Sequence, residues 1–142
     1  MSLLQAAALD GAAGTIFLLA RLVFGLVLAF MGLNHFMNLE TMTGYAGAKN
    51  IPAPAFGVIA SGVMLILGGL GIAAGAYPVL AAGALVTFFV VATPTIHDFW
   101  NAEDTQGEMT HFLKNAALLG ASLGFLALGG ADWPLALNVG LF

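Results

Sequence analysis

The sequence predicts an all-α polytopic membrane protein, an up-and-down bundle of four transmembrane helices. Of the 142 residues, 61% are hydrophobic and 7% are charged, whereas about a quarter of a soluble domain is charged. The mean hydropathy is +1.00. A spanning helix needs about 20 apolar residues, so four spans nearly fill the chain. We therefore expect one transmembrane domain, residues 1–142.

Composition also limits the chemistry and the partners. The chain has no cysteine, which excludes disulfides, iron–sulfur clusters and thiolate zinc sites. A redox role would therefore need a bound cofactor. The formal net charge of −4 argues against a nucleic-acid partner, which would need a basic patch. Membrane lipid is the first partner expected, and acidic loops with few lysines are typical of a halophilic host.

The first span is expected at residues 15–36. The segment before it, residues 1–14, lacks the basic start of a secretory signal, so we expect it to remain in the mature chain. Arg21 and His35 lie about 40° apart around this helix. The same stripe also holds Gly25, Leu28 and Gly32. Arg21 is either a structural anchor that snorkels to the membrane surface or an intramembrane charge with a partner inside the bundle.

A short interfacial element is expected between the first two spans, in residues 37–54. Leu39, Met42 and Ala46 are spaced to share one face of a helix, which predicts a short helix lying in the membrane interface. An ordered loop is the alternative. Two prolines then end this element before the second span begins.

The other spans are expected at residues 56–76, 79–100 and 108–129. The second has no charged residue and is rich in glycine, which favours close contact between helices. The face expected to make that contact holds Gly57, Ser61 and Gly68. In the fourth span, Gly120 and Gly124 have a small-residue spacing of the same kind.

Two features near the ends of the last two spans carry local predictions. Pro94 should bend the third span, and the hydroxyls of Thr93 and Thr95 could bind the backbone carbonyls that it leaves free. Trp133 follows the fourth span and is expected as an anchor at headgroup level, with the apolar tail lying back against the membrane.

The expected threading brings the polar residues of three helices to one membrane face. His35 ends the first span, His97 ends the third, and His111 begins the fourth with Lys114 and Asn115. These five residues form the candidate site. Arg21 lies about 20 Å from His35 along the helix axis and cannot reach the site.

Two ligands suit such a site. The imidazoles and Lys114 could donate hydrogen bonds to the carbonyls of a quinone, and histidine can move the protons that accompany quinone reduction. Alternatively, His35, His97 and His111 could bind a metal ion, because imidazole suits zinc, copper or iron. Histidines that only cap helix ends remain the plainer reading.

Several segments resemble the DoxX family of small four-helix membrane proteins. They are Arg21 with Gly25, Gly32-Leu-Asn-His35-Phe36, Ile51-Pro-Ala-Pro54, Ser61-Gly62 with Gly68-Gly69, and His111-Phe-Leu-Lys114-Asn115. The resemblance covers nearly the whole chain and implies a four-helix bundle in the cytoplasmic membrane, associated with oxidoreductases. One departure is that relatives often carry an acidic residue before the paired glycines. Here Met64-Leu65-Ile66-Leu67 is apolar, which leaves Arg21 without an obvious counter-ion.

The leading functional prediction is therefore a redox-associated, quinone-linked membrane subunit, with an oxidoreductase partner or a homo-oligomer as possible assemblies. The main alternative is a non-catalytic subunit that binds a partner protein through its glycine-rich helix faces. A carrier for lipids or small solutes is a third. The resemblance favours cytoplasmic termini, although three basic residues do not determine the orientation.

Overall fold

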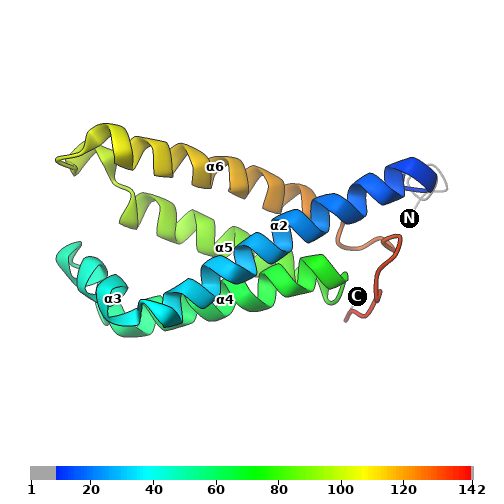
Figure 1. Cartoon of the computed structure of the whole chain (residues 1–142), viewed down its shortest axis with the longest axis horizontal. Coiled ribbons are helices and arrows are strands. Elements are labelled where there is room, and N and C mark those ends of the chain that lie inside the picture. Colours follow the sequence, from blue (N-terminus) through cyan, green and yellow to red (C-terminus); the bar gives the residue numbers. More distant parts are fainter. Residues whose placement is uncertain (1–8, 142) are drawn as a thin grey trace.

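The computed structural model describes residues 9–141 and shows an all-helical chain with four helices long and apolar enough to cross a membrane (Figure 1). The elements in order are α2 (Gly11–Met37), α3 (Leu39–Ala48), α4 (Pro54–Ala74), α5 (Pro78–Ile96), the 3-10 turn η1 (Phe99–Asn101) and α6 (Thr105–Leu128). The predicted all-α, four-span class is confirmed. Each observed boundary of the long helices lies within four residues of the expected one. The predictions for residues 1–8 lie outside the described residues.

The short helix expected after the first span is also present. The helix α3 packs against α4, and Ala46 on its inner face is only 4% exposed. It ends where Asn50 takes a positive φ of 58°, a conformation that asparagine tolerates better than most residues. The ordered-loop alternative is wrong, and α3 lies across the end of the bundle opposite the described chain ends (Figure 1).

Antiparallel α2 and α4 pack almost backbone to backbone through glycines. A Cβ atom on Gly25 would lie 2.3 Å from the carbonyl oxygen of Gly69, and one on Gly32 would lie 2.7 Å from that of Gly62. Gly25 and Gly32, the α2 members of these pairs, both lie in the stripe predicted on the first span. Because any side chain would separate the helices, these glycines set the distance between them.

The contact face predicted on the second span is right for Gly68 and wrong for Gly57. Gly68 packs closely on Leu85 of α5, whereas Gly57 has open space beside it among the described residues. Glycine-rich sequence predicts close packing, but the partner of each glycine depends on the rotation of the helix about its axis. Here Gly62 and Gly69 face α2.

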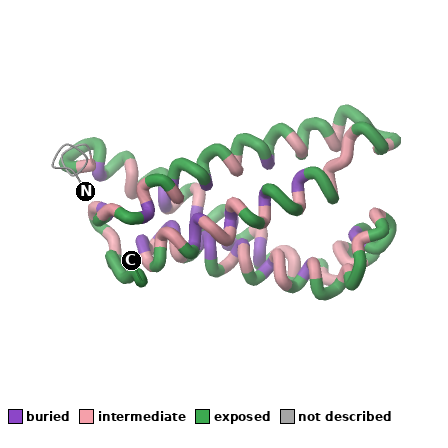
Figure 2. The backbone as a smooth tube through the Cα atoms, turned by 180° about the vertical axis from the view of Figure 1, so that it is seen from behind, coloured by how far each residue is buried: buried purple, intermediate pink, exposed green. Residues whose placement is uncertain are grey.

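The bundle is closed at one end and open at the other. Near the described chain ends, Phe17 of α2 packs on Phe125 of α6 and on Trp133, with ring centroids 5.7 Å and 5.2 Å apart. At the opposite end, α5 and α6 diverge from α2 and α4 (Figure 1). Figure 2 shows buried residues in the middle of the bundle and a largely exposed α6. Large aromatic rings therefore hold the two helix pairs together at the closed end.

Arg21 lies at the closed end, entirely inside the protein. Its side chain is 0% exposed. The guanidinium donates to the carbonyl oxygens of Ile72 (3.2 Å), Ala73 (3.0 Å), Pro134 (2.6 Å) and Leu135 (3.2 Å). Of the two alternatives for this residue, the partner inside the bundle is the one found, and the snorkelling anchor is wrong. The partners are backbone carbonyls at the end of α4 and in the tail.

The C-terminal tail folds back over the end of the bundle. The amides of Leu137 and Asn138 donate to the carbonyls of Ala74 and Gly75 at 2.9 Å and 3.0 Å. Trp133 is 2% exposed, so its prediction as a headgroup-level anchor is wrong. The reason is the tail's return, which places the indole between Arg21 and the aromatic core.

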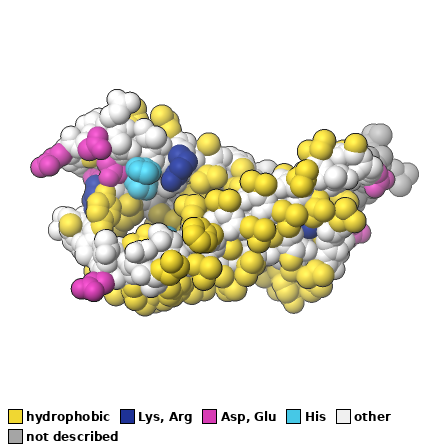
Figure 3. Space-filling view, in the orientation of Figure 1, with side chains coloured by type: hydrophobic (Ala, Val, Ile, Leu, Met, Phe, Trp, Pro, Cys, Tyr) yellow, Lys and Arg dark blue, Asp and Glu magenta, His cyan; other side chains and the backbone are white. Residues whose placement is uncertain are grey.

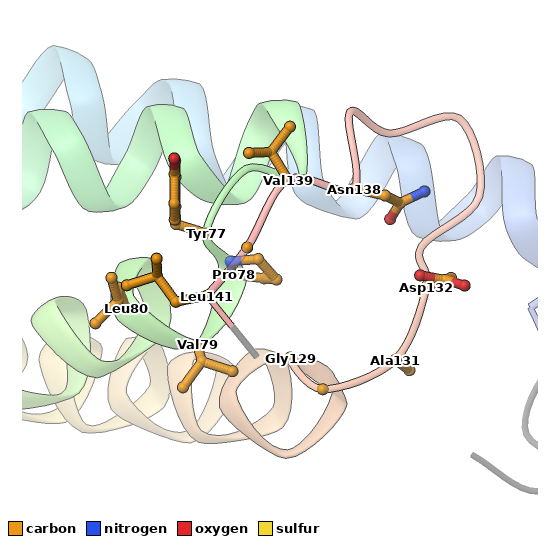
Figure 4. Close-up of a pocket in the computed structure, with 12 residues that line it drawn as sticks. Tyr77, Pro78, Val79, Leu80, Gly129, Ala131, Asp132, Asn138, Val139 and Leu141 are labelled. Atoms are coloured by element: carbon orange, nitrogen blue, oxygen red, sulfur yellow. The ribbon is translucent and has the colours of Figure 1, made fainter.

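A small cavity of about 50 Å³ remains where the tail meets the start of α5 and the end of α6. Tyr77, Val79, Gly129 and Asn138 are among the residues around it (Figure 4). It has room for one or two water molecules. No predicted site residue lines this cavity.

Pro94 lies inside α5, as expected, but the threonines beside it behave differently. The Thr95 hydroxyl donates to the carbonyls of Val91 and Ala92, whereas the buried Thr93 hydroxyl has no partner within residues 9–141. The carbonyl that loses its helical partner is that of Val90, four residues before the proline. Neither hydroxyl binds it, so the expected compensation is wrong in detail.

Candidate functional site

The divergence of the two helix pairs leaves a cleft of about 760 Å³ at the open end. Figure 3 shows the molecule hollowed there, where histidine, acidic and basic side chains gather. The inner walls are mainly apolar and include Met31, Met42, Val58, Met64, Phe88 and Val91. A cleft of this volume is within the range of sites for small organic ligands, about 300–1,000 Å³.

All five residues of the predicted candidate site line this one cleft. His35 comes from α2, and His97 follows the end of α5. His111, Lys114 and Asn115 come from the first half of α6. Asn115 is only 4% exposed, while His111 and Lys114 are exposed. Arg21, at the opposite end, is separate from the cleft, in agreement with its expected distance.

A carboxylate that the sequence did not single out connects two walls of the cleft. Glu108, in the first turn of α6, accepts a hydrogen bond of 2.6 Å from the Tyr45 hydroxyl of α3. Its other oxygen lies 2.8 Å from Nδ1 of His97. The side chains of His97 and Glu108 are 21% and 18% exposed. Glu108 on α6 therefore connects Tyr45 of α3 to His97, which directly follows α5.

A second pair crosses the mouth of the cleft beside the first. Lys49, just after α3, forms an ion pair with Asp98, and its ammonium group lies 5.6 Å from the centre of the Tyr45 ring. Asp98 therefore pairs across the cleft with Lys49 and not with the adjacent His97, which pairs with Glu108. We refer to Tyr45, Lys49, Asp98 and Glu108 together as the clasp.

The pKa values of Tyr45 and Lys49 are both raised in the clasp. The hydrogen bond to Asp98 raises the pKa of Lys49, although partial burial opposes this. Burial raises the pKa of the Tyr45 hydroxyl, and the hydrogen bond to Glu108 raises it further. Both shifts favour the protonated forms, which are the forms that donate hydrogen bonds across the mouth.

The three histidines do not form one cluster. His97 and His111 stack with ring centroids 5.1 Å apart and planes 24° apart. His35 lies on the other wall, with Nδ1 2.8 Å from its own helix's Met31 carbonyl and its ring edge-on to Phe88. Among the described residues, no three histidine, cysteine or acidic side chains are placed to hold a metal ion. The three imidazoles predicted as metal ligands therefore do not meet at one point among the described residues.

Sequence reasoning missed the roles of Tyr45 and Lys49. Both were visible as residues of the first connection, and Glu108 was visible near the expected cluster. The missing signal was the position of α3, which lies across the open end and brings its side chains to the hairpin of α5 and α6. That position follows from packing on α4 and not from any local pattern.

The fold and cleft together define a class: a multi-pass, four-helix membrane protein with a polar-mouthed cleft between its two helix pairs. The family model described as DoxX matches residues 16–98, which is more than half of the 142 residues. The chain belongs to the DoxX family. No curated protein and no solved structure matches it. The matched region ends just after His97, so α6 and its three site residues lie outside the match.

Proposed function

We propose that this protein is a redox-associated subunit of the cell membrane that binds a quinone-type lipid in the cleft. The observation that carries the proposal is that His35, His97, His111, Lys114 and Asn115 all line one cleft whose deeper walls are apolar. A quinone has the same polarity, with a polar ring at one end of an apolar tail. The five residues grouped from their positions in the sequence are thus among the residues that line the cleft.

The composition of the cleft suits each part of such a ligand. The tail would lie against the methionine, valine and phenylalanine side chains, which bury apolar surface without a polar cost. The ring oxygens would accept hydrogen bonds from the Lys114 ammonium and the Asn115 amide, beside the imidazoles that line the same polar end. Since Asn115 is almost fully buried, its amide would form the deeper part of the polar surface.

Proton movement to and from the ligand has a plausible set of groups in this arrangement. His97 is hydrogen-bonded to Glu108 and stacked on the exposed His111. Histidine titrates near neutrality and exchanges protons readily. Electrons would come from an oxidoreductase partner, because the cysteine-free chain has no thiol redox couple of its own. Reduction of the quinone would then take two electrons from that partner and two protons.

The test is to purify the protein from its native membranes in mild detergent and to extract bound lipid for quinone analysis. Wild-type protein should retain quinone in roughly stoichiometric amounts, and His97→Ala and His111→Ala should each lose most of it. Thr110→Ala is the matched control, because Thr110 is exposed beside His111 and does not line the cleft. Helix content and elution volume establish that each variant is folded.

Quinone content that is absent from wild type, or equal in wild type and both histidine variants, would overturn the proposal. Metal analysis of the same sample separates the metal alternative. If wild-type protein contains about one metal ion per chain and the histidine variants lose it, the metal alternative is favoured over a quinone.

The partner-binding alternative keeps support from one observation. A Cβ atom on Gly120 or Gly124 would meet nothing within 4 Å, and both residues lie on the exposed side of α6. Small exposed residues let a second helix approach closely. Gly120→Leu should then dissociate a complex without unfolding the bundle. Gly68→Leu is unsuitable for this test, because Gly68 packs inside the fold.

A further inference from the structure

The proton positions on His35 are determined by its backbone partner. Nδ1 lies 2.8 Å from the carbonyl oxygen of Met31. A carbonyl oxygen can only accept a hydrogen bond, so Nδ1 must carry the proton that is donated. In the neutral ring, Nε2 is then unprotonated. His35 therefore brings a hydrogen-bond acceptor to its wall of the cleft.

His97 has the same polarity for a different reason. Its Nδ1 lies 2.8 Å from Oε2 of Glu108, while Oε1 of that carboxylate accepts from the Tyr45 hydroxyl at 2.6 Å. The hydrogen bond from Tyr45 favours the ionised form of Glu108, so the group is a carboxylate and accepts from His97 as well. Nδ1 again carries the proton, and Nε2 of the neutral ring is a second acceptor. A carboxylate that orients an imidazole in this way is a common device in proteins.

The cleft therefore combines two acceptors with donors. His35 and His97 lie on opposite helix pairs, while the Lys114 ammonium group is a donor on α6. A quinone oxygen can only accept, so it could meet Lys114 but would leave both Nε2 atoms unpaired. A hydroquinone hydroxyl donates and accepts at once. Its hydrogens can go to the imidazoles while its oxygens accept from the donors.

We infer that the cleft binds the hydroquinone form of its ligand in preference to the quinone form. The hydroxyls donate to Nε2 of His35 and of His97, and Glu108 and Tyr45 act as positioning residues that keep His97 in the accepting tautomer. The inference rests on the proposed quinone site and specifies which redox state that site recognises. No electron transfer is part of this step.

The size of the preference follows from the hydrogen bonds that the quinone cannot make. Each net hydrogen bond changes a binding constant about fivefold, so the loss of two gives about 25-fold. The ratio of the two dissociation constants is therefore the quantity to measure. It is insensitive to losses of active protein, which affect both ligands equally.

The experiment uses three ligands with the same decyl tail and titrates each into full-length, delipidated protein by anaerobic calorimetry. They are decyl-benzoquinone, the corresponding hydroquinone, and the hydroquinone dimethyl ether, in which both hydroxyls are capped. The hydroquinone should bind about 25-fold more tightly than the quinone. The dimethyl ether, which accepts but cannot donate, should bind no more tightly than the quinone.

Two variants connect the preference to the named residues. His35→Phe keeps an aromatic ring beside Phe88 and removes one acceptor, so the ratio should fall to about fivefold. Glu108→Gln replaces the carboxylate with an amide that can accept or donate, so it should also reduce the ratio. Glu103→Gln is the matched control, since Glu103 is exposed and does not line the cleft. Its ratio should equal that of wild type.

The possible outcomes separate the inference from the proposed function. Equal affinity for quinone and hydroquinone, or tighter binding of the quinone, overturns the inference and leaves the quinone site standing. A dimethyl ether that binds as tightly as the hydroquinone also overturns it. If none of the three ligands binds, both the inference and the proposed function are wrong. The wild-type comparison decides these cases even if a variant fails to fold.

Discussion

Replacing Arg21 with methionine should destabilise the closed end of the bundle. Methionine keeps an unbranched apolar side chain but removes all four hydrogen bonds to backbone carbonyls. Charge-assisted hydrogen bonds contribute about 1.5–3 kcal/mol each. The cost of burying the guanidinium at 0% exposure offsets much of that sum. We expect a net loss of about 3–5 kcal/mol in the free energy of unfolding, because the carbonyl oxygens lose their donor and each buried acceptor left unsatisfied costs about 1–3 kcal/mol.

The measurement combines unfolding with a local reporter. The chain has two tryptophans, so Trp100→Phe leaves the buried Trp133 as the only indole. Its emission reports on the tail, because the Trp133 ring lies 5.5 Å from the Arg21 guanidinium. In the Trp100→Phe background, Arg21→Met should shift the Trp133 emission to longer wavelength. It should also lower the midpoint temperature of unfolding in detergent, measured by circular dichroism.

Arg21→Lys provides the graded control. Lysine keeps the charge but has three donors without the planar fork of arginine, so it cannot satisfy all four carbonyls. Its loss of stability should be smaller than that of Arg21→Met. An Arg21→Met protein with wild-type stability and unchanged Trp133 emission would refute the reasoning, because it would mean that the guanidinium does not hold the tail.

Three further predictions test the packing, the clasp and a buried hydroxyl. Gly69→Ala places a Cβ atom 2.3 Å from the Gly25 carbonyl and should cost about 1–3 kcal/mol in thermal unfolding, whereas Gly57→Ala, with open space beside it, should change stability by less than about 0.5 kcal/mol. Tyr45→Phe removes the hydrogen bond to Glu108 and should speed amide exchange in α3. Because the pKa of Tyr45 is raised, the stability that this hydrogen bond contributes should be complete below about pH 10, the ordinary tyrosine pKa. It should be lost as the pH rises through the raised pKa of the folded protein. If the free energy of opening of α3 in wild type, taken from the exchange rate after division by the intrinsic base-catalysed rate, does not fall at alkaline pH, the Tyr45–Glu108 hydrogen bond is not what holds α3. Thr93→Val replaces a buried hydroxyl that has no partner among the described residues and should leave thermal stability equal or higher by about 1 kcal/mol. A clear loss of stability would show that the hydroxyl makes a hydrogen bond in the folded protein.

The membership of the candidate site was accessible from the sequence, but its form was not. Alternating spans bring the ends of the first and third helices and the start of the fourth to one face, which is why His35, His97 and His111 could be grouped in advance. The same argument does not say whether those residues meet a packed interior or a cleft. That depends on the large aromatic rings at the closed end, which join the helix pairs there and leave them apart at the other. Whether the residues bind a ligand stays a prediction.

The partners of single residues were the least accessible part. Arg21 seemed to lack a counter-ion because the neighbouring span has no acidic residue, yet its partners are backbone carbonyls, which every residue has and no residue type reveals. Trp133 was placed at the membrane surface from its position after the last span. Only the return of the tail, through hydrogen bonds from Leu137 and Asn138, puts its ring in the core.

Hydropathy and helical periodicity by themselves determined that this chain spans a membrane four times, which stripe of the first helix faces its neighbour, and which polar residues share a face. These properties depend on residue type and spacing, and a helix converts spacing directly into direction. Tertiary structure alone decided the rotation of α4, the place of α3 across the open end, and the pairing of Glu108 with Tyr45 and His97. Such contacts join residues far apart in the chain, and their energies depend on the fit of whole surfaces.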